Sequence, residues 1–91
     1  MSGPLRRTAR VMNKRGLHAR AAAKIVEAAA RFTSEITIIH DGQTVNARSI
    51  MGLMMLAASM GTEVEVQAEG PDSAQAMTAI IALIEAKFGE E

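Results

Sequence analysis

The side chains best suited to chemistry are His18 and Arg20, which stand in the run Gly16-Leu17-His18-Ala19-Arg20. An imidazole is a nucleophile near pH 7, because its unperturbed pKa is about 6.5. A guanidinium donates paired hydrogen bonds to phosphates and carboxylates. These two residue types, two positions apart in the sequence, predict a site that attracts an anion.

A helix is expected to position both side chains. Residues 19–30 are dominated by alanine and straight-chain residues, which favour a helix, whereas residues 13–16 form a polar turn that ends in glycine. His18 therefore falls at or beside the N-cap, where free backbone N–H groups and the helix dipole favour an anion. An equally simple interpretation is that His18 only caps the helix.

The remaining segments supply a sheet for this helix to cover. Residues 5–12 alternate weakly between apolar and polar side chains, and residues 62–68 alternate cleanly. Residues 35–40 and 43–47 are joined by Asp41-Gly42, a strong hairpin signal.

Two further helices are predicted. The first spans about residues 49–58, with Ser49 as its N-cap, Gly61 closing the segment and Gly52 as a cost in its middle. The second opens after Gly70-Pro71 with Asp72 and Gln75 as a capping box, and ends at Gly89. Its apolar side is expected to consist of Met77, Ile80, Ile81, Ile84 and Phe88.

The element order is thus βαββαβα. A sheet with one polar face and helices between its strands predicts an α+β fold. We expect an open-faced sandwich, with a four-stranded, mainly antiparallel sheet and three helices on one face, in a single domain spanning residues 1–91.

Charge is distributed unevenly although the formal net charge is zero. Nine of the ten basic residues lie at or before Arg48, and seven of the ten acidic residues lie after it. A basic cluster near His18 would steer a phosphate or an acidic protein surface toward it. Nucleic acid is a competing partner, but the chain lacks Trp and Tyr and has only two Phe for base stacking.

Other classes of protein are disfavoured. Cysteine is absent, no apolar run reaches the length of a membrane span, and the N-terminus lacks the apolar stretch of a signal peptide, so a cytoplasmic protein is expected. The sequence contains no motif for a cofactor site, a metal-ligand cluster, a nucleophilic triad or a glycine-rich phosphate loop. His40, at the hairpin turn, is interpreted as a surface residue without chemistry.

The run Gly16-Leu17-His18-Ala19-Arg20 and the later run Ser49-Ile50-Met51-Gly52-Leu53-Met54 occur in the right order at two helix starts. Together they resemble HPr, the histidine-containing phosphocarrier family of the bacterial phosphotransferase system. The resemblance covers nearly the whole chain.

The resemblance implies a role for each motif. His18 would carry a phosphoryl group on Nδ1, Arg20 would stabilise it, and a dedicated kinase would modify Ser49. Serine at an N-cap is also ordinary in a helix without regulation. The resemblance places Ile50, Met51 and Met54 in a docking patch beside His18. About half of the apolar side chains between positions 50 and 55 could instead simply be core. The expected basic rim of this patch consists of Arg15, Lys24, Arg31 and Arg48.

The implied partners are an enzyme I-like donor charged from phosphoenolpyruvate, a type IIA acceptor and an HPr kinase/phosphorylase. The chain would then be a stoichiometric carrier, not an enzyme, and we expect a monomer because its partners must reach the same face. The alternatives are a regulatory binding module that phosphorylation switches, and a nucleic-acid binder.

One residue departs from the family pattern. Most members have a proline after the arginine, where this chain has Ala21. Proline has no N–H, so Ala21 adds an amide donor near His18. Some nitrogen-related phosphocarriers are similar in lacking this proline, and the sequence leaves the sugar-transport and nitrogen-regulatory versions both open.

Overall fold

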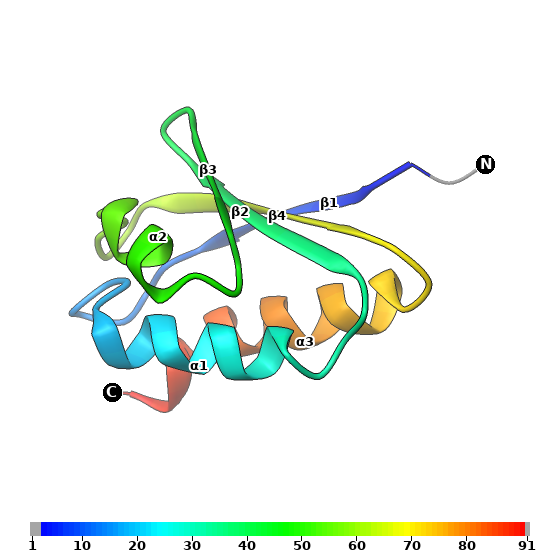
Figure 1. Ribbon diagram of the computed structural model, residues 1–91. Coiled ribbons are helices and arrows are strands. Elements are labelled where there is room, and N and C mark those ends of the chain that lie inside the picture. The colour runs from blue at the N-terminus through cyan, green and yellow to red at the C-terminus, as the bar shows by residue number, and fades with distance from the viewer. Residues whose placement is uncertain (1–2, 91) are drawn as a thin grey trace.

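The computed structural model describes residues 3–90, which form one antiparallel sheet with helices against it (Figure 1). The four strands are β1 (Leu5–Arg10), β2 (Glu35–His40), β3 (Gln43–Asn46) and β4 (Glu63–Glu69), in the order β1-β4-β2-β3. Every neighbouring pair is antiparallel, with Ala9 opposite Val64 and Ile38 opposite both Val66 and Val45. The expected α+β architecture and element order are confirmed.

The helices are α1 (Ala19–Ala29), α2 (Ile50–Met55) and α3 (Ser73–Glu85), followed by a 3-10 turn η1 (Lys87–Gly89). Figure 1 shows α1 and α3 side by side beneath the sheet, and α2 beside the N-terminal end of α1. All three helices thus help to enclose one apolar core. Its largest fully buried side chains are Val11, Ile25, Ile38, Leu53, Val64, Val66, Ile80, Ile84 and Phe88.

The hairpin and the alternating strand follow the sequence closely. Asp41 and Gly42 both adopt positive φ, as a type I′ hairpin turn requires. In β4, Val64, Val66 and Ala68 are buried, whereas Glu63 and Glu69 are exposed. The sheet therefore has one face on the core and one polar face.

Three predicted boundaries were wrong. β1 ends at Arg10, not at residue 12. α2 ends at Met55, where Leu56 is the C-cap and Ala57 takes a φ of 54°, so Gly61 does not close it. α3 ends at Glu85, not at Gly89, and Phe88 reaches the core from the 3-10 turn with a φ of 56°. Burial of the Phe88 ring holds this left-handed backbone, which a local pattern does not reveal.

The capping box of α3 was also wrong. Asp72 is the N-cap residue but its side chain makes no capping hydrogen bond, and Gln75 is exposed. The Asp72 carboxylate instead accepts from the Thr33 N–H at 3.0 Å, the Ser34 N–H at 2.9 Å and the Ser34 hydroxyl at 2.5 Å. These bonds, the Ser34 hydroxyl foremost, lower the pKa of Asp72 to about 2. The residue ties α3 to the turn before β2.

Residues 3–90 contain neither a membrane-spanning helix nor a metal-ligand cluster. No helix there is long and apolar enough to cross a membrane. Nor does this part of the chain contain a cluster of three or more His, Asp or Glu that would hold a metal ion.

Candidate functional site

The loop before α1 is held by backbone contacts. Gly16 has a φ of 64° and donates to the Asn13 carbonyl at 3.1 Å, and the Leu17 N–H donates to the Ala58 carbonyl at 3.0 Å. A Cβ on Gly16 would lie 2.4 Å from the Ala58 oxygen, so only glycine fits. The loop is thereby fixed against the segment between α2 and β4.

His18 is the N-cap of α1, as the sequence predicted. Its backbone is extended, its carbonyl accepts from the Ala22 N–H at 2.9 Å, and its Nδ1 accepts from the Arg20 N–H at 3.2 Å. The amide that reaches the ring therefore belongs to Arg20 and not to the fully buried Ala21. The ring nitrogen lies among the free donors of the helix N-terminus.

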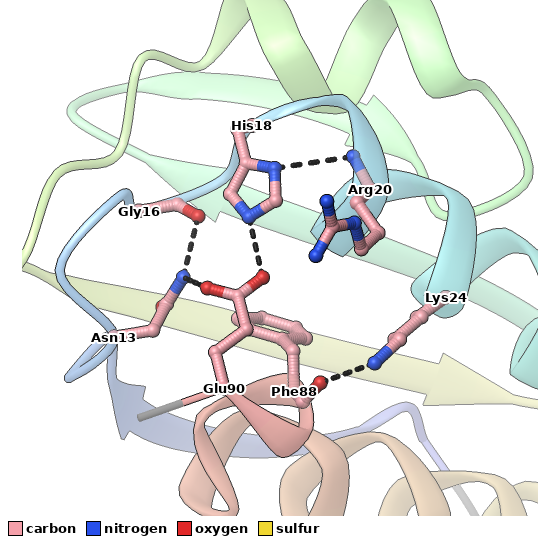
Figure 2. A network of polar contacts seen from close by, with 7 residues as sticks. All are labelled: Asn13, Gly16, His18, Arg20, Lys24, Phe88 and Glu90. Carbon is pink, nitrogen blue, oxygen red and sulfur yellow. Dashed lines mark hydrogen bonds and ion pairs between the residues drawn. The ribbon is translucent and has the colours of Figure 1, made fainter.

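The other ring nitrogen contacts a residue that sequence reasoning missed. His18 Nε2 lies 2.5 Å from Oε2 of Glu90, and the two side chains are only 13% and 15% exposed. The other Glu90 oxygen accepts from the Asn13 side-chain amide at 3.0 Å, and the same amide donates to the Gly16 carbonyl at 2.8 Å (Figure 2). Hydrogen bonds from Asn13 and, to a smaller extent, His18 lower the pKa of Glu90. No local signal links residues so far apart in the chain.

These two contacts define the state of the neutral ring. Nδ1 accepts a hydrogen bond from an N–H, and Nε2 faces a carboxylate, which can only accept. The proton therefore lies on Nε2, and Nδ1 has its lone pair available.

Basic side chains surround this end of α1. Lys14, Arg15, Arg20 and Lys24 line a hollow together with Gly89 and Glu90. Figure 2 shows the Arg20 side chain beside the ring, and Lys24 Nζ donates to the Phe88 carbonyl at 2.5 Å. Of the expected rim, Arg15 and Lys24 are thus close to His18.

The Arg48 guanidinium lies at the C-terminal end of α1, away from His18. It donates to the Ala29 carbonyl at 3.2 Å and to the Phe32 carbonyl, and Arg31 also follows the C-terminal end of α1. A helix rises about 1.5 Å per residue, so both arginines lie roughly 16 Å or more from the N-terminus of α1. Arg31 and Arg48 therefore do not gather around His18 as Arg15 and Lys24 do.

Ser49 is the N-cap of α2, and its Oγ accepts from the Gly52 N–H at 2.9 Å. A Cβ on Gly52 would lie 3.0 Å from this Oγ and 3.1 Å from Val45 Cβ. The glycine that lowers helix propensity therefore lets α2 pack closely on β3.

The apolar side chains of α2 are mostly outside the core. Leu53 is the buried residue of the helix, whereas Met51 and Met55 are each 71% exposed and Ile50 and Met54 are about 40% exposed. The expected apolar patch is present, and less of α2 is core than the sequence suggested. Because α2 packs against α1, this patch lies at the His18 end of the molecule (Figure 1).

His40 is placed elsewhere, on the hairpin. One of its ring nitrogens lies 3.0 Å from the Glu63 carbonyl.

An open-faced α+β sandwich in which a histidine caps the first helix, with an arginine beside the ring, is typical of a small histidine phosphocarrier. Residues 5–86 match the family described as "PTS HPr component phosphorylation site". The chain belongs to the HPr family of phosphocarrier proteins of the phosphotransferase system.

Relatives span nearly the whole chain. Phosphocarrier protein HPr of Cupriavidus necator is 48% identical over 94% of this chain and 97% of its own length. That of Treponema pallidum is 52% identical over 93% and 97%. Phosphocarrier protein NPr of Shewanella violacea is 43% identical over 94% of both chains.

Solved structures share the fold. The crystal structure of HPr-C-His from Thermoanaerobacter tengcongensis has a TM-score of 0.91, with 48% identity over 96% of this chain and 98% of that chain. A crystal structure of an HPr dimer from the same organism has a TM-score of 0.76, with 50% identity over 88% and 92%.

Proposed function

We propose that His18 is the residue that carries the phosphoryl group, on Nδ1. The observation that supports this best is the pair of ring contacts, which leaves the proton on Nε2 and the lone pair on Nδ1. The donor would be an enzyme I-like protein charged from phosphoenolpyruvate, and the acceptor a type IIA protein. The chain would then work stoichiometrically, without turnover of its own and without a cofactor.

The proposed step needs little rearrangement. Nδ1 attacks the phosphorus on the donor, the donor's own bond to phosphorus breaks, and its electron pair stays with the donor. The Arg20 N–H that held Nδ1 becomes free to donate to a phosphoryl oxygen. The Arg20 guanidinium and the nearby Arg15 and Lys24 add positive charge for the same group.

The exposed side chains of Ile50, Met51 and Met54 are proposed to dock against both partners. Flexible methionine side chains suit a surface that must fit a donor and an acceptor in turn. Phosphorylation of Ser49 by an HPr kinase/phosphorylase would put negative charge at the edge of this patch and thus alter partner choice.

We further propose that residues 1–91 act as one cytoplasmic domain and as a monomer, since donor and acceptor must reach the same face. Sedimentation of the purified chain tests the monomer, because a relative has been crystallised as a dimer.

The carrier role is tested by incubation with enzyme I and labelled phosphoenolpyruvate. The parent and His40→Ala are expected to form an acid-labile adduct, and His18→Ala is not. Labelling of His18→Ala at the parent level would contradict the proposal.

A regulatory binding module is the second candidate, favoured by the similarity to an NPr protein. Pull-downs with the unmodified, His18-phosphorylated and Ser49-phosphorylated forms separate the two. A carrier needs no stable partner outside its exchange chain, whereas a regulatory module retains one in a single phosphorylation state.

A further inference from the structure

Glu90 is fixed in place at both ends of its carboxylate. One oxygen lies 2.5 Å from His18 Nε2, and the other accepts from Asn13 Nδ2 at 3.0 Å. The Asn13 side chain is fully buried and also bonds to the Gly16 carbonyl, within the loop that carries His18. Asn13 therefore fixes the Glu90 carboxylate in position relative to the His18 ring.

The backbone before Glu90 is equally constrained. Phe88 is buried in the core, its carbonyl accepts from Lys24 Nζ, and positive φ values at Phe88 and Gly89 turn the chain back toward the start of α1. The Lys24 hydrogen bond and the buried Phe88 ring thus bring Glu90, which follows α3, to the His18 ring (Figure 2).

Phosphorylation changes what this carboxylate faces. In the resting ring, Nε2 carries the proton and the ring is neutral. Once Nδ1 has formed its bond to phosphorus, both nitrogens are substituted and the ring carries a positive charge. Its Nε2–H then points at the Glu90 carboxylate, in a partly buried position where an ion pair is screened less than in water. When the phosphoryl group leaves, the bonding pair returns to Nδ1 and the ring is neutral again.

We propose that Glu90, held by Asn13, is a positioning residue for phosphoryl transfer, which keeps the proton on His18 Nε2 before the reaction and stabilises the cationic ring after it. This inference rests on His18 as the phosphoryl acceptor. The alternative is that Glu90 only fastens the end of the chain to the loop.

The ring's proton is measured first, by ¹⁵N NMR of the imidazole in the unmodified protein above the pH at which the ring titrates. The parent is expected to show the Nε2–H tautomer, and Glu90→Ala a mixture of tautomers. A parent ring with its proton on Nδ1 would overturn the proposal.

The charge is tested by the rate of labelling from enzyme I. Glu90→Gln keeps the size of the side chain and an oxygen acceptor but removes the charge, so the rate is expected to fall about tenfold. Glu90→Asp restores the charge and should recover part of the rate. Glu85→Gln, which removes an exposed carboxylate at the end of α3, is the matched control and should label like the parent.

A merely structural role predicts a different result. The labelling rate of Glu90→Gln would then be within twofold of the parent rate, even if its thermal stability is lowered. That result would show the proposal to be wrong. If the parent itself is not labelled at His18, the carrier assignment fails; if the parent is labelled and Glu90→Gln matches it, only the role of Glu90 fails.

Discussion

Gly16 and the Ala58 carbonyl are in such close contact that a Cβ on Gly16 would lie 2.4 Å from the carbonyl oxygen. Real Cβ atoms do not approach backbone so closely. The contact connects the loop that carries His18 to the segment following α2, and the Leu17 N–H donates to the same carbonyl. The loop that carries His18 and the apolar patch of α2 are therefore held in fixed relative positions by the backbone.

Gly16→Ala is expected to destabilise the protein by about 2 kcal/mol or more, since a positive φ alone costs an alanine roughly 1 kcal/mol or more and the backbone clash adds to it. Urea unfolding followed by circular dichroism measures this. Gly42→Ala is the control, because Gly42 also has a positive φ but has nothing within 4 Å of a Cβ. Equal losses in the two variants would show that the contact with Ala58 contributes nothing.

The bonds of Asp72 predict an acid-sensitive stability. Its pKa is lowered in the fold to about 2 from an ordinary 3.8, so the carboxylate stabilises the folded state fully above pH 4, and this contribution is lost as the pH falls through about 2. Asp72→Asn should lower the free energy of unfolding at pH 7 and flatten its fall between pH 4 and pH 2. Urea unfolding across this range is the measurement. Asp41→Asn, in the exposed hairpin turn, should leave the pH profile unchanged.

The sequence predicted those elements whose signals are local. The Asp41-Gly42 turn, the alternation of residues 62–68 and the alanine-rich run after His18 each specify their structure from neighbouring residues, and a hairpin turn, a strand and a helix are observed there. His18 as an N-cap follows from the same kind of signal.

Features that depend on distant contacts could not be predicted in this way. Asp72 carries the residue type of a cap, but Thr33 and Ser34, far back in the chain, are better partners for its carboxylate. Glu90 reaches His18 only because Phe88 is buried with a left-handed backbone, a conformation that no propensity assigns to phenylalanine.

Met51 is expected to contribute to docking and not to folding, because its side chain is 71% exposed. Met51→Ala should raise the KM for the chain as substrate of enzyme I by about fivefold or more, as truncation of an interface anchor does. Steady-state labelling kinetics give this value, and thermal unfolding should be unchanged. Leu5→Ala is the control, because it removes an exposed apolar side chain at the start of β1, the end away from the His18 loop. An equal rise in the KM of Leu5→Ala would contradict a docking patch confined to α2.

Ser49→Asp should slow phosphorylation at His18 while the fold is preserved. An aspartate at the N-cap can accept from the Gly52 N–H as the serine hydroxyl does, and its charge is favourable at the start of a helix. The same charge lies beside the exposed Ile50 and Met51, where it must be desolvated when a partner docks. Labelling from enzyme I and thermal unfolding measure the two effects separately. Ser73→Asp adds an equal charge at the first residue of α3, away from α2, and should label like the parent. If Ser49→Asp is labelled as fast as the parent and Ser73→Asp, charge at position 49 does not control docking.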